Sequence, residues 1–229
     1  MRKLFYAGDS TVKFNKIDTY PQMGLSQGIQ LYLKDDVVVR SYAENGRSTK
    51  SFINEGRLSR IAEEISEGDF LFIEFGHNDE KEADPTRYAA AETDYKDNLK
   101  KFVSVAKEHG AYPVIITPVA RRVFDENGKI SPTHGKYPAC AIEAAKECGV
   151  PYIDLTSVSE RYLESVGDYA SRPMYVYPKD NSHLTMHGAV VFSGFIADGL
   201  RRIGEPYAGL LVPQDTSFAR NYNDAEVVD

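Results

Sequence analysis

The stretch LFYAGDS, residues 4–10, decides the fold, because a short apolar run ends there in a glycine turn that carries a serine. Four further apolar runs follow along the chain, at residues 37–42, 70–75, 113–116 and 152–153. Continuous apolar runs of this kind suit parallel strands that are buried on both faces. We therefore expect five strands in one parallel sheet.

Amphipathic segments separate the expected strands. Apolar residues recur with helical spacing in the segments 58–65, 95–106 and 192–200. The alternation of strand and helix predicts an α/β protein, a three-layer α/β/α domain with a flavodoxin-like, parallel five-stranded sheet. A single domain over residues 1–204 accounts for this pattern. Residues 205–229 carry little periodicity, and we expect them to form a C-terminal arm or tail.

The composition argues against several classes of function. The 229 residues carry a formal net charge of −7, which disfavours general binding of nucleic acids or anionic membranes, since these need a broad basic surface. A local basic pocket remains compatible with this charge. No stretch approaches the roughly 20 apolar residues of a membrane span, and the N-terminus lacks the features of a signal peptide. We expect a cytoplasmic protein, although a mature secreted chain would read the same way.

The two cysteines, Cys140 and Cys148, lie in a segment that reads as one helix. Eight residues along a helix rise by about 12 Å, which is too far for a disulfide bond. We therefore expect two reduced thiols. No zinc-binding spacing of cysteine and histidine occurs in the sequence, so no metal is expected.

Four short polar blocks carry the candidate chemistry. Ser10 follows the first expected strand, Gly46 lies in a turn after the second, and Asn78 follows the third. The fourth block, DNSH at residues 180–183, precedes the last helix. Each block alone has an ordinary interpretation, as a helix cap, a turn or a polar loop. Together they place a nucleophile, hydrogen-bond donors and an Asp–His pair near one edge of the sheet, where open α/β sheets bind ligands.

In this order the four blocks resemble the SGNH, or GDSL-like, esterase family, which is named for Ser, Gly, Asn and His in four blocks. Ser10, Gly46 and Asn78 match the first three blocks, and Asp180 with His183 matches the last. The resemblance extends from residue 8 to about residue 200, with threonine after the serine where many members have leucine. It implies the SGNH hydrolase fold and hydrolysis of a carboxylic ester without a metal or an organic cofactor.

The chemistry of these residues suggests a role for each one. His183 is the candidate base that removes the Ser10 proton, because an imidazole pKa of about 6.5 suits proton transfer near neutral pH. Asp180 lies three residues earlier and can orient the imidazole ring. The resemblance implies an oxyanion hole made by the backbone N–H groups of Ser10 and Gly46 and the side-chain amide of Asn78.

Other stretches are similar to one branch of this family, the rhamnogalacturonan acetylesterases. They are GDSTV at 8–12, TPVARR at 117–122, THGKYP at 133–138 and DNSHLT at 180–185. This similarity implies that the substrate is an acetylated, pectin-derived oligosaccharide. Arg121, Arg122 and His134 are the candidate substrate-binding residues, since guanidinium groups pair with carboxylates such as those of uronates. A solvated loop is the equal alternative for these three residues.

Two other functions remain open. A lipase or thioesterase of the same family would keep the Ser, Asp and His residues but would need a wide apolar cleft, whereas the loops here are rich in charge, tyrosine and histidine. A non-catalytic carbohydrate-binding descendant is the second alternative. The intact Ser10, Asp180 and His183 argue against it.

Several other residues have competing interpretations. His77 is a weaker candidate for a base, and we expect it to make a structural hydrogen bond. His187 follows the last block at a spacing that can chelate a metal on a helix, but no acidic ligand or cysteine adjoins it. Glu74 is expected to be a paired structural carboxylate. The segment 169–177, with Arg172, forms either a wall that stacks on sugars or a packed loop.

Overall fold

A parallel sheet of five strands lies at the centre of the computed structural model, which describes residues 2–213. The strands are β1 (Arg2–Gly8), β2 (Val37–Ser41), β3 (Phe70–Glu74), β4 (Tyr112–Ile116) and β5 (Tyr152–Ile153). Their order across the sheet is β2-β1-β3-β4-β5, and every neighbouring pair is parallel. The five predicted strands and their parallel arrangement are confirmed. The order reverses at β1, so the crevice beside the end of β1 is the expected ligand site.

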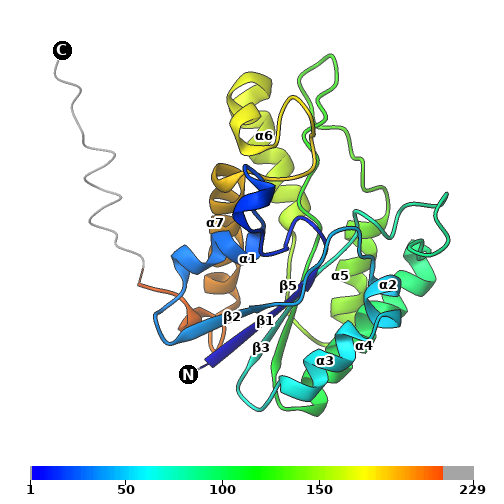
Figure 1. Ribbon diagram of the computed structural model, residues 1–229, viewed down its shortest axis with the longest axis vertical. Helices are drawn as coiled ribbons and strands as arrows, with labels where there is room; N and C mark the ends of the chain where they lie inside the picture. Colours follow the sequence, from blue (N-terminus) through cyan, green and yellow to red (C-terminus); the bar gives the residue numbers. More distant parts are fainter. Residues whose placement is uncertain (1, 214–229) are drawn as a thin grey trace.

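Helices cover both faces of the sheet (Figure 1). One layer contains α1 (Leu25–Gly28), α6 (Leu155–Ser171) and α7 (Met186–Ile203). The other contains α2 (Thr49–Asn54), α3 (Arg57–Glu64), α4 (Lys96–Glu108) and α5 (Tyr137–Cys148). The predicted three-layer α/β/α architecture is thus confirmed. Within the described part of the chain, no helix is long and apolar enough to cross a membrane.

Five short helical turns lie between or after these elements in the described part of the chain. They are η1 (Ile17–Thr19), η2 (Ile29–Tyr32), the π-helical turn η3 (Ala91–Tyr95), η4 (Arg172–Met174) and η5 (Ala208–Leu210). The π-helical turn leads directly into α4, so the segment predicted as a helix from residue 95 begins with a wider turn.

Side chains of the strands alternate between two hydrophobic cores. In β1, Leu4 and Tyr6 pack in the core with α1, α6 and α7, whereas Phe5 and Ala7 pack in the core with α2 to α5. Successive residues of a strand point to opposite faces, so a strand with helices on both sides has no exposed face. This explains why β1 and β3 read as continuous apolar runs rather than as alternating patterns, whereas the edge strand β2 is partly exposed.

The cysteine-containing segment forms α5, as predicted. Cys140 and Cys148 are both free thiols, and Cys140 is buried.

The first part of the predicted C-terminal arm packs against the domain. Tyr207, Leu210 and Leu211 are buried in the core that also contains α7. The Tyr207 hydroxyl donates a hydrogen bond to the carbonyl of Pro113, at 2.7 Å. The packed part of the chain therefore continues past residue 204, and the rest of the predicted arm, residues 214–229, lies outside the described residues.

Candidate active site

A sharp turn at the end of β1 presents Ser10. The Asp9 carboxylate fixes this turn, because its Oδ1 atom accepts hydrogen bonds from the backbone N–H and the hydroxyl of Thr11, both at 2.9 Å. A Cβ atom on Gly8 would lie 2.9 Å from the carbonyl oxygen of Glu74 in the neighbouring strand. Only glycine therefore fits where the turn begins.

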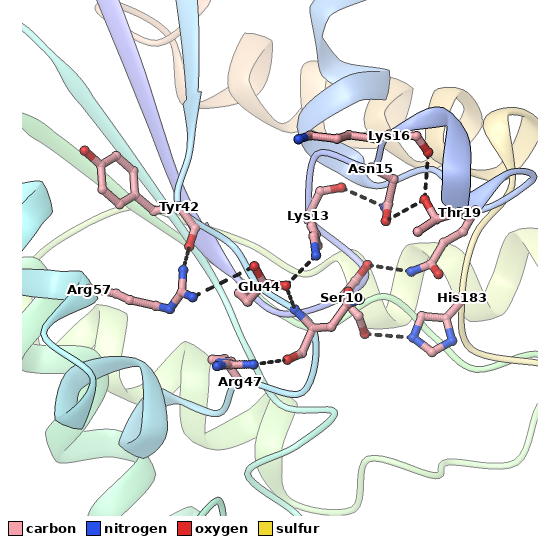
Figure 2. A network of polar contacts seen from close by, with 12 residues as sticks. Ser10, Lys13, Asn15, Lys16, Thr19, Tyr42, Glu44, Arg47, Arg57 and His183 are labelled. Carbon is pink, nitrogen blue, oxygen red and sulfur yellow. Dashed lines mark hydrogen bonds and ion pairs between the residues drawn. The ribbon is translucent and has the colours of Figure 1, made fainter.

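Ser10, His183 and Asp180 form one hydrogen-bonded chain. The Nε2 atom of His183 lies 2.9 Å from the Ser10 hydroxyl, a contact visible in Figure 2. The Nδ1 atom lies 2.7 Å from Oδ2 of Asp180. An ionised carboxylate can only accept a hydrogen bond, so Nδ1 carries the ring proton and Nε2 is left to accept from the serine. This arrangement suits removal of the Ser10 proton by His183.

The loop before α7 holds the Asp180 carboxylate. Its Oδ1 atom accepts from the backbone N–H groups of Ser182, at 2.6 Å, and His183, at 2.8 Å. Partial burial by itself raises the pKa of Asp180, but the hydrogen bonds from His183 and Ser182 outweigh it and bring the pKa below the ordinary value. Asp180 is therefore ionised at neutral pH, as the tautomer of His183 requires.

A turn between β2 and α2 presents Gly46. The N–H of Arg47 donates to the carbonyl of Glu44 at 3.3 Å, and Gly46 has a φ of +75°, which favours glycine. The Glu44 carboxylate accepts from the N–H of Asn45 at 2.8 Å and pairs with the Lys13 ammonium group, so it anchors the turn (Figure 2).

Two backbone N–H groups at the site are available to a ligand. Among residues 2–213, the N–H groups of Ser10 and Gly46 make no hydrogen bond. Both residues line the same pocket. They are therefore free to donate to a negatively charged oxygen beside the Ser10 hydroxyl.

The surroundings of Asn78 fix the orientation of its side-chain amide. The Lys81 Nζ atom lies 2.9 Å from Oδ1, and since an ammonium group can only donate, that atom must be the oxygen. Nδ2 donates to the carbonyl of Arg47 at 3.0 Å, which leaves its second hydrogen for a ligand. The Arg87 guanidinium also approaches Oδ1, at 3.5 Å. Two cations at the carbonyl end polarise the amide and strengthen its remaining donor.

A pocket of about 490 Å³ joins these groups. It is lined by Ser10, Thr11, Gln22, Asn45, Gly46, His77, Asn78, Lys81, Arg121, Asp180, Ser182 and His183. None of these residues is an aliphatic or a phenyl-type aromatic. The pocket thus combines a paired nucleophile and base with a group of N–H donors, which is the equipment for attack on an ester carbonyl.

Comparison with known proteins identifies the family. Residues 7–189 match the GDSL-like Lipase/Acylhydrolase family. The chain belongs to this family. The resemblance seen in the four sequence blocks is therefore confirmed, and the protein is a carboxylic ester hydrolase.

Two bacterial relatives match this acylhydrolase over almost its whole length. Rhamnogalacturonan acetylesterase RhgT of Bacillus subtilis (strain 168) is 38% identical over 225 residues, which cover 93% of this chain and 95% of the relative. Probable rhamnogalacturonan acetylesterase YesY of the same organism is 33% identical over 214 residues, covering 92% of this chain and 98% of the relative.

Solved structures share the fold of the acylhydrolase. The crystal structure of Bacillus subtilis YxiM matches with a TM-score of 0.81 and 26% identity, over 90% of this chain and 57% of that one. The chain therefore spans little more than half of that structure's length. Axe2, an acetylxylan esterase from Geobacillus stearothermophilus, has a TM-score of 0.61 and 15% identity over 90% of this chain and 95% of that one. The predicted SGNH hydrolase fold is confirmed.

Arg121 is the one predicted substrate-binding residue that lines the catalytic pocket. Its guanidinium group pairs with the Glu80 carboxylate and donates to the carbonyl of His77 at 3.3 Å. The charge of Arg121 is therefore largely neutralised inside the protein.

Arg122 points into the protein, contrary to the prediction that it binds substrate. It is only 3% exposed and donates to the Ser171 hydroxyl at 2.9 Å and to the Asp168 carbonyl at 2.8 Å. It also forms an ion pair with the Asp168 carboxylate. This prediction is wrong because acceptors within the protein occupy the guanidinium group. Arg122 instead ties the chain after β4 to the C-terminal end of α6.

His134 is also buried, at 3% exposure, and does not line the pocket. Its Nε2 atom lies 3.0 Å from the carbonyl of Val119, and its Nδ1 atom lies 3.1 Å from the Glu80 carboxylate. Both ring nitrogens thus face acceptors within the protein. The prediction that His134 contacts the substrate is wrong for the same reason as that for Arg122.

His77 lines the pocket but differs from the expected hydrogen-bonded residue. Its Nε2 atom has no partner within the described chain, and its ring packs edge-on against His134, with ring centres 4.5 Å apart. Burial, together with the nearby positive groups, holds the pKa of His77 well below its ordinary value. A neutral ring of such low basicity is a poor general base, so His183 remains the candidate.

The segment 169–177 and His187 each had two interpretations in the sequence. Two guanidinium groups, those of Arg122 and Arg172, lie 4.8 Å and 5.0 Å from the centre of the Tyr177 ring, and Tyr177 remains 41% exposed. Tyr169 is 81% exposed, with Arg172 over it. His187 is exposed on α7, and no group of three or more potential metal ligands occurs within residues 2–213.

Three buried carboxyl groups adjoin the functional residues: Asp9, Glu74 and Asp79. Glu74 accepts from the Tyr6 hydroxyl at 2.9 Å and so has the paired structural role expected from the sequence. Burial raises the pKa of all three, and that of Asp79 reaches about 8. These groups are therefore neutral more readily than exposed carboxyl groups.

Lys81 is one of the pocket residues that sequence analysis missed, as is Gln22. Lys81 lies three residues after Asn78 in a loop between β3 and η3. Lysines are common in polar loops, and the spacing gives no sign that this one turns back to the amide.

Proposed function

We propose that this acylhydrolase removes acetyl groups from pectin-derived rhamnogalacturonan saccharides. Ser10 is the nucleophile, His183 is the general base and acid, and Asp180 orients the imidazole. The hydrogen-bonded chain of 2.9 Å and 2.7 Å supports these roles. The names of the relatives RhgT and YesY support the choice of substrate.

The reaction follows two steps that use the same residues. Ser10 attacks the acetyl carbonyl while its proton passes to Nε2 of His183, and the carbonyl oxygen becomes negatively charged. The N–H groups of Ser10 and Gly46 and the amide of Asn78 stabilise this oxyanion. The imidazolium then protonates the departing sugar oxygen, which leaves acetyl-Ser10. Water, deprotonated by His183, attacks this ester and releases acetate and free Ser10.

No aliphatic or phenyl side chain is among the residues that line the pocket, and this observation carries the choice of an acetylated saccharide. A lipase or a long-chain thioesterase must bury an alkyl chain, and each CH₂ gains about 0.8 kcal/mol only when apolar surface receives it. The pocket residues offer amides, hydroxyls, imidazoles and charged groups instead. An acetyl group needs little apolar surface, and a sugar has hydroxyls that match such donors and acceptors.

Rates of ester hydrolysis test this function, measured as acetate release from the oligosaccharides and as p-nitrophenol release from the octanoate. Acetylated rhamnogalacturonan oligosaccharides, acetylated xylooligosaccharides and p-nitrophenyl octanoate should be compared at equal enzyme concentration. We expect the highest kcat/KM on the rhamnogalacturonan oligosaccharides and very low activity on the octanoate. The Ser10→Ala protein is the matched control and should release no acetate above background. A preference for the octanoate would support the lipase alternative.

A serine-directed phosphonate separates an enzyme from a non-catalytic descendant. The wild-type protein should gain the mass of one phosphonyl group at Ser10, because His183 activates that hydroxyl. The Ser10→Ala protein should gain none. A wild-type protein that stays unlabelled would favour the carbohydrate-binding alternative.

The cytoplasmic location expected from the sequence bears on substrate size. A cytoplasmic enzyme meets short imported oligosaccharides rather than polymeric pectin. We therefore expect kcat/KM to be at least as high on short acetylated fragments as on the polymer. Cell fractionation with an antibody against the protein tests the location directly.

A further inference from the structure

A second hollow adjoins the catalytic pocket. It measures about 660 Å³, and its lining shares Asn45 and Gly46 with that pocket. The turn that carries the Gly46 N–H therefore forms the boundary between the two. A saccharide whose ester lies at Ser10 can extend across this turn, so that its next residue occupies the second hollow.

Three basic residues line the second hollow: Arg47, Lys50 and Arg87. We call this set the basic hollow. Two carboxylates lie against it, because Glu55 pairs with Arg47 and Asp84 pairs with Arg87. The cations outnumber these carboxylates, so the basic hollow attracts an anion although the whole chain is negatively charged.

Each cation of the basic hollow keeps donors that the described chain does not use. Arg47 uses Nε on Glu55 and one terminal nitrogen on the carbonyl of Asn45, at 2.8 Å, and its other terminal nitrogen has no hydrogen bond within residues 2–213. Lys50 donates one proton to the carbonyl of Pro85 at 2.8 Å, and the ammonium group has two more. These contacts hold the side chains in place and leave donors for a ligand.

Arg87, in the loop between β3 and η3, also keeps a donor that the described chain does not use. Its Nε atom donates to Asp84 at 2.6 Å, and one terminal nitrogen reaches the Asn78 carbonyl oxygen at 3.5 Å. The other terminal nitrogen makes no hydrogen bond with the described residues. Arg87 thus links the oxyanion amide of Asn78 to the basic hollow.

We propose that the basic hollow binds the carboxylate of a uronate residue in the saccharide whose ester lies at Ser10. This inference rests on the proposed function, since it assigns a subsite to the same saccharide. Guanidinium and ammonium donors that are partly shielded from water bind carboxylates through charge-assisted hydrogen bonds. Arg122 and His134 cannot serve in this role, because acceptors within the protein occupy them. The anion subsite therefore lies on the side of Gly46 away from Ser10.

Calorimetric binding to the full-length Ser10→Ala protein tests the subsite without turnover. The probe is an unacetylated oligosaccharide of alternating galacturonic acid and rhamnose, and its carboxyl-reduced form is the neutral counterpart. We expect tighter binding of the acidic form. Lys50→Gln in the Ser10→Ala background should reduce this preference about threefold to tenfold. Lys50→Arg should retain most of it, because the charge and the donors remain.

Lys100→Gln is the matched control, since Lys100 pairs with Asp97 and Glu147 on the surface of α4 and lines neither hollow. It should leave the preference unchanged. Equal affinity for the two oligosaccharides, absence of binding by both, or an equal loss for both in Lys50→Gln would overturn the subsite. Failure of the proposed function would give a different result: the wild-type protein would release no acetate from acetylated forms of either oligosaccharide.

Discussion

The two sides of the catalytic pocket are built on different principles. One side, the proton-transfer side, consists of Ser10, Asp180 and His183. The other, the donor side, consists of Gly46, Asn78 and Lys81. The proton-transfer side is a hydrogen-bonded chain in which a carboxylate lies at one end and a neutral hydroxyl at the other. On the donor side every group at the pocket is an N–H donor, and cations support the amide from behind.

This difference teaches how the chemistry is divided. In the proposed mechanism the proton-transfer side changes its protonation state during each turnover, and its groups are coupled by short hydrogen bonds. The donor side must not change, because preorganised dipoles stabilise an oxyanion best when they need no rearrangement. The contacts of Asn78 with Arg47 and Lys81 supply that rigidity. Variants on the two sides should therefore differ in size of effect and in additivity.

The largest effect is expected on the proton-transfer side. Ser10→Ala and His183→Ala should each lower kcat by about 10⁴-fold or more, because the nucleophile and its base act as one unit. The double variant should be scarcely worse than either single one. The rate of acetate release, measured at fixed time points for each variant, gives kcat. Unfolding curves of the same variants check that the fold is intact. Multiplicative losses in the double variant would show that the two residues act independently.

On the donor side, Asn78→Ala should cause the second-largest loss of activity. Loss of one oxyanion donor lowers kcat by about 10²- to 10³-fold, with little change in KM, because the donor acts mainly on the transition state. Steady-state kinetics on an acetylated oligosaccharide measure both constants. A rise in KM at constant kcat would make Asn78 a ground-state binding residue and would remove the contrast between the two sides.

Lys81→Met should have a smaller effect, because Lys81 acts through Asn78. We expect kcat to fall about tenfold, the value of one hydrogen bond to a charged group. In the Asn78→Ala background the same substitution should change kcat little, since the amide that it positions is gone. The kinetic double-mutant cycle therefore distinguishes positioning from a separate contribution.

Lys101→Met is a matched control for Lys81→Met. Lys101 donates to the Asn98 carbonyl oxygen at 3.0 Å and is also three residues from its asparagine, but it lies on α4, and neither residue lines the catalytic pocket. Its replacement should leave kcat unchanged. A fall in kcat equal to that of Lys81→Met would mean that loss of any such pair disturbs the fold.

Asp79→Asn should affect turnover least and pH-dependent stability most. Burial raises the pKa of Asp79 from 3.8 to about 8 in the folded protein. Between these two values the folded state holds a proton that the unfolded state has released. The contribution of Asp79 to stability is therefore fully present below about pH 4 and is lost as the pH rises towards 8.

An amide at position 79 does not titrate, and its carbonyl can still accept from the Thr49 N–H, a contact of 2.9 Å in the wild type. Between pH 5 and 7 the slope of unfolding free energy against pH should differ from the wild type by about 1.4 kcal/mol per pH unit. Urea unfolding of both proteins at several pH values measures it. Parallel curves would show that Asp79 is ionised in the folded state.

The sequence by itself determined the architecture and named the three residues of the hydrogen-bonded chain. A strand with helices on both faces must be apolar throughout, so runs such as 4–7 and 70–75 revealed the sheet before any contact was known. The paired residues Asp180 and His183 lie within one loop, and their spacing was visible in the sequence. Ser10 is separated from His183 by 173 positions. Ser10 could be placed because strand ends in a parallel sheet meet at one edge, whereas His183, in a loop before a helix, was joined to it through the family resemblance.

Only the tertiary structure decided which charges face the ligand. A sequence shows that Arg122 and His134 can be cationic, but their partners Asp168 and Glu80 lie 46 and 54 positions away. The same holds for Arg87, which reaches Asn78 from a loop that carries no recognisable pattern. Burial and neutralisation depend on the atoms that surround a charged group, and those atoms come from distant segments. Residue type fixes the charge, whereas packing fixes whether that charge remains available.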